Sequence, residues 1–124
     1  MVVDDDEEIR DVAKETLENF GYEVFCTDNG KKTLEIIKKE KEIRLFLLDL
    51  RLPEMNGIEL CFEIRKSDPV SIIYAITGCV TKEALIMCRK VGFDDYFSKP
   101  FDIKTLISIV HFAFDKLRRW EEYK

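Results

Sequence analysis

Long hydrophobic runs are missing from this sequence, and no stretch reaches the ~18 apolar residues that a membrane-spanning helix requires. The first residues also lack the charged segment followed by an apolar segment that marks a secretory leader. Positive charge is in deficit, since 20 Lys and Arg stand against 25 Asp and Glu, a net charge of -5. This sign is unfavourable for binding a phosphate backbone. We therefore expect neither a membrane segment nor direct binding of nucleic acid.

Paired cysteine motifs are absent as well. The sequence contains no C-x-x-C, and the cysteine spacings match no paired metal motif. Each cysteine lies in or beside an apolar stretch, where a reduced thiol packs as a small hydrophobic group. We interpret all of them as reduced and expect a cytoplasmic location. The four are Cys26, Cys61, Cys79 and Cys88.

The composition is that of a folded domain of ordinary size. The chain has 124 residues, of which 46% are hydrophobic and 36% are charged. This balance provides for a core and a charged surface, unlike the composition of disordered chains. No linker, internal repeat or low-complexity segment divides the sequence. We therefore interpret residues 1–124 as a single domain.

Short apolar segments alternate with longer helical patterns along the whole chain. The pattern predicts strands over residues 2–3, 22–27, 43–50, 71–76 and 96–98. It predicts helices over residues 7–20, 31–39, 58–66, 82–91 and 103–121. The segment 43–50 is almost entirely apolar, which is typical of a strand buried on both faces. Five consecutive strand–helix units predict an α/β fold with a doubly wound parallel sheet and right-handed crossovers.

The first and last helices each carry an apolar face at helical spacing. In the first helix the face consists of Ile9, Val12, Ala13, Leu17 and Phe20. In the last helix it consists of Ile103, Leu106, Val110, Ala113 and Leu117. Three further apolar residues of the last helix lie partly off this face, namely Ile107, Phe114 and Trp120. They are either scattered surface residues or part of a surface for a partner. His111, the only histidine, is interpreted as a packing or surface residue.

Polar side chains follow the predicted strands where these strands end. They are Asp4, Asp5 and Asp6 after the first strand, Asp49 at the third, Thr77 at the fourth and Lys99 after the fifth. Ligands of a doubly wound sheet bind beyond the carboxyl ends of its strands, so we expect these side chains to meet. An isolated buried carboxylate is costly and clustered carboxylates repel, whereas Mg²⁺ relieves both effects. These residue types indicate phosphoryl transfer onto Asp49, although the run Asp4–Asp6 could also serve only to cap a helix.

Four segments, in this order, resemble receiver domains of bacterial two-component response regulators. The first two are Val2-Val3-Asp4-Asp5-Asp6-Glu7-Glu8-Ile9-Arg10 and Leu47-Leu48-Asp49-Leu50-Arg51-Leu52-Pro53-Glu54-Met55-Asn56-Gly57. The other two are Ile76-Thr77-Gly78 and Tyr96-Phe97-Ser98-Lys99-Pro100-Phe101. The resemblance covers essentially the whole chain. It implies a flavodoxin-like fold with five helices around a five-stranded sheet of strand order 2-1-3-4-5.

The resemblance also implies roles for the residues at the strand ends. Asp49 would be the phosphoacceptor. Mg²⁺, for which Mn²⁺ can substitute, would be bound by Asp4, Asp5, Asp49 and the backbone carbonyl of Arg51. Within the acidic pair, Asp5 is favoured over Asp4 as the direct ligand. Phosphate would come from outside the chain, from a histidine kinase, a histidine phosphotransfer protein or a small phosphodonor.

The same resemblance predicts a switch. Thr77 and Lys99 would bind the phosphoryl group, and the Lys99–Pro100 bond would be cis. Tyr96 matches an aromatic residue whose ring moves inward in the active state, although a half-buried strand tyrosine explains it nearly as well. The change would reach the fourth helix, fifth strand and fifth helix, where Ile107 and Phe114 could meet a second copy or an output domain.

Three features depart from the family pattern. The first strand is shorter than usual, and Asn56 stands where relatives often have Asp, a change that a turn tolerates. Arg51 and Cys79 occupy variable positions that tune hydrolysis of the phosphoryl group in relatives, so the motif does not predict its lifetime.

Two alternatives to a phosphorylated receiver follow from the sequence. A haloacid-dehalogenase-type phosphatase would also form an aspartyl phosphate, but it usually has a second Asp two residues after the nucleophile, where this chain has Arg51. A degenerate receiver would act only as a binding scaffold. We expect a signalling domain that is not an enzyme, beyond promoting its own phosphorylation and dephosphorylation, and the last helix could lead into an output domain.

Overall fold

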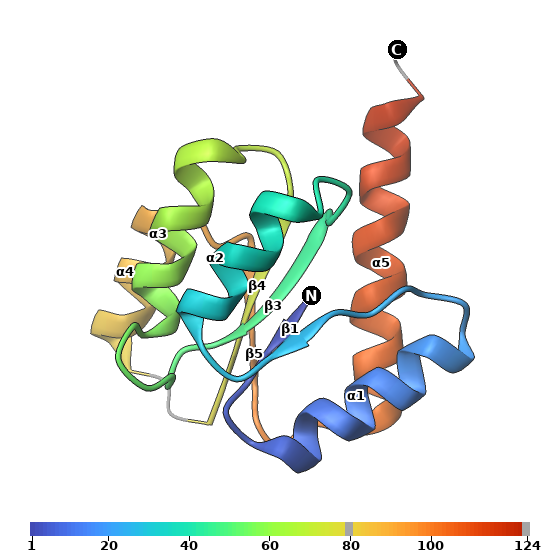
Figure 1. Ribbon diagram of the computed structural model, residues 1–124, viewed down its shortest axis with the longest axis horizontal. Helices are drawn as coiled ribbons and strands as arrows, with labels where there is room; N and C mark the ends of the chain where they lie inside the picture. Colours follow the sequence, from blue (N-terminus) through green and yellow to red (C-terminus); the bar gives the residue numbers. More distant parts are fainter. Residues whose placement is uncertain (79–80, 123–124) are drawn as a thin grey trace.

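The computed structural model describes residues 1–78 and 81–122 and contains one parallel sheet of five strands. The strands are β1 (Val2–Val3), β2 (Cys26–Thr27), β3 (Leu45–Asp49), β4 (Ile72–Thr77) and β5 (Asp95–Ser98). The helices are α1 (Glu7–Asn19), α2 (Gly30–Lys39), α3 (Gly57–Ser67), α4 (Lys82–Val91) and α5 (Ile103–Glu121). The strand order β2-β1-β3-β4-β5 confirms the predicted fold class (Figure 1).

Helices cover both faces of the sheet, with α1 and α5 on one side and α2, α3 and α4 on the other (Figure 1). Side chains of β3 alternate between the two layers. Leu45 and Leu47 pack with the α5 residues, whereas Phe46 and Leu48 pack with the α3 residues. The prediction of a central strand buried on both faces is therefore confirmed.

The predicted second strand was too long. The segment 22–27 pairs only over Cys26–Thr27, because its neighbour β1 consists of two residues in register with those two. Upstream of β2, the Tyr22 N–H donates to the carbonyl of Leu17 at 3.1 Å, and its ring stacks on Phe114 at a centroid distance of 5.1 Å. Tyr22 thus belongs to the turn after α1 and packs against α5.

The predicted apolar faces of α1 and α5 were partly wrong. In α1, Ala13 and Leu17 are buried, but Val12 is 42% exposed. Phe20 is 54% exposed and packs edge-on against His111. In α5, Ile103 is 52% exposed at the first turn, and Ile109, which the predicted face omitted, is buried. Each helix carries more apolar residues than its contact with the sheet covers, so the tertiary packing selects among them.

The outer surface of α5 also differs from the prediction. Phe114 stacks on Tyr22 and packs against the core, so its expected place on the partner surface is wrong. Phe112 lies roughly 160° further round the helix, given 3.6 residues per turn, and is 71% exposed. It therefore lies on the flank away from Tyr22. Trp120, near the end of α5, is 73% exposed.

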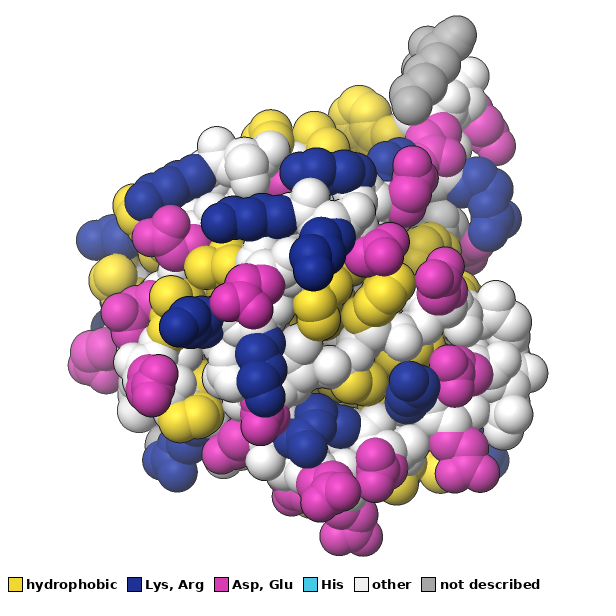
Figure 2. Space-filling model, viewed as in Figure 1, with side chains coloured by type: hydrophobic (Ala, Val, Ile, Leu, Met, Phe, Trp, Pro, Cys, Tyr) yellow, Lys and Arg dark blue, Asp and Glu magenta, His cyan; other side chains and the backbone are white. Residues whose placement is uncertain are grey.

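Charges of both signs cover the outside of the domain. On the face shown in Figure 2, Lys and Arg are interspersed with Asp and Glu, so positive charge does not gather in one area there. No helix among the described residues is long and apolar enough to cross a membrane.

Candidate functional site

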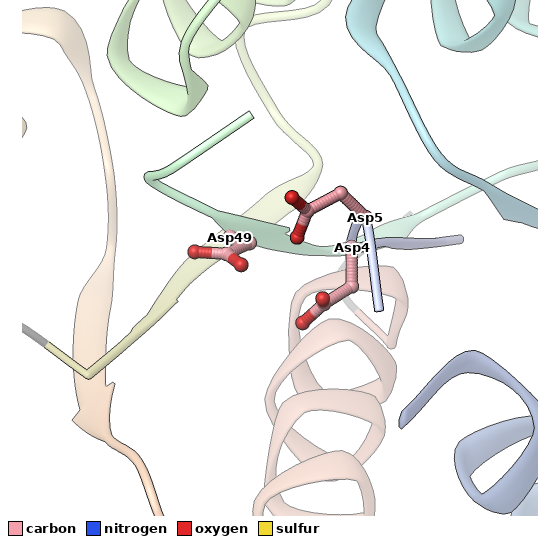
Figure 3. Close-up of side chains that lie close together, drawn as sticks. All are labelled: Asp4, Asp5 and Asp49. Atoms are coloured by element: carbon pink, nitrogen blue, oxygen red, sulfur yellow. The ribbon is translucent and has the colours of Figure 1, made fainter. Parts of the chain in front are cut away.

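Three carboxylates meet where β1 and β3 end. Asp4 and Asp5 directly follow β1, and Asp49 is the last residue of its neighbour β3. One oxygen from each lies within 4.8 Å of the other two (Figure 3). Asp4 and Asp49 are buried, at 3% and 5% exposure, whereas Asp5 is exposed. The predicted cluster is thus present, with two members inside the domain and one at its surface.

Lys99 brings a positive charge into this cluster from the loop after β5. Its Nζ donates to Asp4 Oδ2 at 2.6 Å and to Asp49 Oδ2 at 3.1 Å. The Lys99–Pro100 peptide bond is cis, as the resemblance implied. The ammonium group therefore joins two carboxylates whose residues are 45 positions apart in sequence, and it partly neutralises both.

Further backbone groups hold Asp4 and Asp49 in place. The N–H of Asp6 donates to Asp4 Oδ1 at 2.9 Å, and the N–H of Arg51 donates to Asp49 Oδ1 at 2.9 Å. Both oxygens of Asp4 thus have protein donors. Among residues 1–78 and 81–122, no donor contacts the Asp5 carboxylate, which leaves its oxygens more accessible to an ion.

Burial and charge act against each other at this site. Burial raises the pKa of the Asp49 carboxyl, and the negative charge of Asp4 raises it further. The hydrogen bond from the Arg51 N–H and the positive charge of Lys99 lower this pKa, but by less than burial raises it. Burial alone would lower the pKa of Lys99, but the hydrogen bonds and charges of Asp4 and Asp49 outweigh it and raise this pKa. Lys99 is thus stabilised in its protonated, charged form, whereas the ionised form of the neighbouring Asp49 is destabilised.

Thr77 lies beside the cluster as the last residue of β4, and it is 1% exposed. Asp49 is in register with Ile76, so Thr77 lies one residue beyond it on the adjacent strand. The N–H of Lys99 donates to the carbonyl of Thr77 at 2.8 Å, which ties the two residues together. Tyr96 lies apart from the cluster on β5, with 41% of its surface exposed. The structure therefore gathers the predicted site residues except Tyr96.

Two residues support the site without a role assigned from the sequence. The Arg10 guanidinium donates to the carbonyl of Asp4 at 2.8 Å and so anchors α1 to the end of β1. Gly57 opens α3 directly against β3, because a Cβ atom there would lie 2.4 Å from the Asp49 carbonyl oxygen. Arg10 could have been found from its place one helical turn after the cap Asp6. The need for glycine at position 57 depends on a close approach that local sequence does not reveal.

The three cysteines that the structure describes take no part in the cluster. Cys26, Cys61 and Cys88 are free thiols, and the last two are buried between α3 and α4. Burial raises the pKa of Cys61 to about 12, which keeps this thiol protonated. Cys79, at one of the variable positions flanking the site, lies outside the described residues.

Comparison with known proteins gives a consistent family. The family model described as "response regulator receiver domain" matches residues 1–111. An uncharacterised transcriptional regulatory protein of Bacillus subtilis, YrkP, is 36% identical over 127 residues, covering 100% of this chain and 51% of the relative. A "probable transcriptional regulatory protein" of Picosynechococcus sp. is 33% identical over 114 residues, covering 87% of this chain and 45% of the relative. The chain thus spans about half the length of these curated relatives.

Solved structures give the same result. The CheY-like response regulator receiver domain protein of Methanospirillum hungatei JF-1 superposes with a TM-score of 0.89 at 32% identity, over 99% of this chain and 95% of that one. The chemotaxis protein CheY4 of Vibrio cholerae superposes with a TM-score of 0.85 at 26% identity, over 90% of this chain and 94% of that one.

Proposed function

Because the chain belongs to the family of response regulator receiver domains, we propose that it transmits a signal by accepting a phosphoryl group on Asp49. The observation that carries this proposal is the contact of Lys99 with both Asp49 and Asp4, with Asp5 beside them. This arrangement provides a nucleophilic carboxylate, a fixed cation and further carboxylates at one point.

The donor set fits a hard divalent cation. Three carboxylates gather within 4.8 Å, and Mg²⁺ binds such oxygens while retaining several waters. Asp5 and Asp49 would hold the ion directly with the backbone carbonyl of Arg51, and Asp4, already bonded to Lys99 and the Asp6 N–H, would act mainly by its charge. When bound, Mg²⁺ (or Mn²⁺) supplies positive charge that stabilises the negative oxygens of a phosphoryl group.

The chain's own residues account for the transfer. A carboxylate oxygen of Asp49 forms the new bond to phosphorus as the bond from phosphorus to one imidazole nitrogen of the donor breaks. The donor ring already carries a proton on its other nitrogen, so it leaves as neutral imidazole. Lys99 turns from Asp49 toward the phosphoryl oxygens as a point charge. The hydroxyl of Thr77, one residue beyond the site on β4, binds another oxygen. The Arg51 N–H holds the carboxylate in orientation.

Movement of Thr77 toward the phosphoryl group would open space that the Tyr96 ring can fill. Tyr96 borders a groove between α4 and β5, which Leu85, Ile86 and Phe93 also line. On α5, the exposed Phe112 would extend this surface in place of Phe114. We propose that this α4–β5–α5 surface binds a second copy or an output domain. An output domain fits the length of the transcriptional regulatory relatives, of which this chain covers about half.

The upstream partner would be a histidine kinase or a histidine phosphotransfer protein, acting in the cytoplasm, where the cysteines would stay reduced. A receiver that serves only as a scaffold is the alternative. It would not need the Lys99–Asp49 contact to be retained, so the intact cluster favours phosphorylation.

The test is phosphorylation by acetyl phosphate with Mg²⁺, followed by mass spectrometry. Wild type should gain one acid-stable, base-labile phosphoryl group, and Asp49→Asn should gain none. Asp5→Ala should bind Mg²⁺ more weakly and therefore need a higher Mg²⁺ concentration for half-maximal phosphorylation. The exposed Asp11→Ala is the matched control and should need the same concentration as wild type. Equal phosphorylation of Asp49→Asn, or none in wild type, would contradict the proposal.

A further inference from the structure

Helix α4 is attached to the rest of the domain unevenly along its length. Cys88, in its second half, is the only residue of the helix that is buried. The amino-terminal end begins at the exposed cap Thr81, and Ile86 and Met87, at the middle of the helix, are 44% and 43% exposed. The carboxyl-terminal end continues into the buried Phe93, and the Cys61 thiol of α3 lies 3.7 Å from the carbonyl of Val91.

The main attachment at this end is the side chain of Arg65. Arg65 belongs to α3, and helix α3 lies beside helix α4 (Figure 1). Its side chain is only 16% exposed. Nε donates to the carbonyl of Gly92 at 2.9 Å, and Nη2 pairs with Asp94 Oδ2 at 2.9 Å. Nη1 donates to the carbonyls of Ser71 at 2.7 Å and Asp68 at 3.2 Å. One guanidinium therefore joins α3, the loop before β4 and the turn after α4.

Asp94 carries this connection into the sheet. Its Oδ2 also accepts the N–H of Ile73 at 2.8 Å, and its own N–H donates to the carbonyl of Ile73 at 2.8 Å. Gly92, between α4 and Asp94, has φ of 109°, and a Cβ atom there would lie 3.0 Å from Arg65 Nε. The left-handed turn thus leaves room for the guanidinium to lie against the backbone.

We propose that Arg65 locks the carboxyl-terminal end of α4 to the sheet, so that α4 responds to phosphorylation by tilting about Gly92. This regulation rests on the proposed function of Asp49. Thr77 leads toward the amino-terminal end of α4, where the helix has the fewest anchors among residues 1–78 and 81–122. A shift at this end would be amplified at Leu85 and Ile86 while Val91 stays in place. Arg65 has no hydrogen bond or ion pair with the site carboxylates Asp4, Asp5 and Asp49 or with Lys99, so it is a positioning residue.

The experiment uses methyl NMR of the whole chain, free and with beryllofluoride and Mg²⁺ as a phosphoryl analogue. In wild type, the methyl shifts of Leu85 and Ile86 should change more than those of Val91. In Arg65→Met, which keeps an apolar stem, the change at Val91 should rise to match that at Ile86. The adjacent exposed Lys66→Met is the matched control and should behave as wild type.

Hydrogen exchange of the free protein tests the lock independently of phosphorylation. The N–H groups of Gly92 and Phe93 both donate to the carbonyl of Cys88. They should exchange about tenfold faster in Arg65→Met, since the hydrogen bonds of a charged donor are lost. If this variant does not fold, Asp94→Asn replaces it, because the amide oxygen can still accept the Ile73 N–H while the ion pair is gone.

Unchanged exchange in the variant would overturn the lock, and equal methyl shifts along α4 in wild type would overturn the tilt. Failure of the proposed function looks different. Beryllofluoride would then change no NMR signal near Asp49 in wild type or in the variants, while the hydrogen-exchange rates of the Gly92 and Phe93 N–H groups would still depend on Arg65.

Discussion

Replacing Asp49 by Asn should stabilise the unphosphorylated domain in the absence of Mg²⁺. At an effective dielectric constant of about 20, two carboxylates within 4.8 Å repel by about 3.5 kcal/mol. Asp49 has two such neighbours, Asp4 and Asp5. Lys99 Nζ, at 3.1 Å, attracts Asp49 by about 5 kcal/mol on the same scale. The repulsion of Asp49 by Asp4 and Asp5 therefore exceeds its attraction to Lys99 by about 2 kcal/mol. Burial of the Asp49 charge adds to this destabilisation, whereas solvent around the exposed Asp5 weakens the repulsion from Asp5.

We expect Asp49→Asn to raise the free energy of unfolding by about 1–2 kcal/mol at pH 7, or the midpoint of thermal unfolding by roughly 3–8 °C. The amide keeps an oxygen for the Arg51 N–H. Because the folded-state pKa of Asp49 is raised, mainly by burial, its ionisation destabilises wild type at pH values above this pKa. The gain should shrink as the pH falls through the folded pKa, and it should vanish below the unfolded value of about 3.8.

The assay is urea unfolding followed by circular dichroism at several pH values, without Mg²⁺. Asp11→Asn, on the exposed surface of α1, serves as the control and should change stability by less than about 0.5 kcal/mol. Added Mg²⁺ should stabilise wild type more than Asp49→Asn, because an ion that binds only the folded state shifts the equilibrium. A variant no more stable than wild type at pH 7, or a gain independent of pH, would refute this electrostatic argument.

Three further predictions concern packing and the switch. Gly57→Ala should cost about 1–3 kcal/mol of unfolding free energy in urea titrations, because its Cβ would lie 2.4 Å from the Asp49 carbonyl oxygen; a neutral effect would mean that α3 can shift away. Phe114→Ala should cost about 1–2 kcal/mol, because this ring is partly buried, whereas Phe112→Ala, 71% exposed in wild type, should be nearly neutral; similar costs for both would show that the flank of α5 is misassigned. Thr77→Ala should still accept phosphate, but the NMR shifts that phosphorylation causes at Tyr96 should shrink; shifts as large as in wild type would exclude this threonine from the switch.

Much of the site was predictable because its residues stand at places that local patterns define. The apolar segments before Asp4 and Asp49 identify strand ends, and in a parallel sheet these ends share one edge. The proximity of the carboxylates to Lys99 follows from that rule and from the order of the motifs. The double contact of Lys99 does not, since the direction of a side chain depends on its whole surroundings.

Where several residues or segments had similar local patterns, tertiary packing decided which of them formed a contact or a strand. Phe112 and Phe114 are equally apolar, and only the position of Tyr22 next to α5 determines which of them is covered. The segment 22–27 has strand-like residues throughout, but β2 extends only as far as its partner β1 offers hydrogen bonds. From the sequence, Arg65 resembles an ordinary surface cation of a helix. Its contacts with Gly92 and Asp94 exist only because the turn after α4 packs against α3. Sequence periodicity is a local property and sets the elements, whereas contacts between distant segments depend on all of them at once.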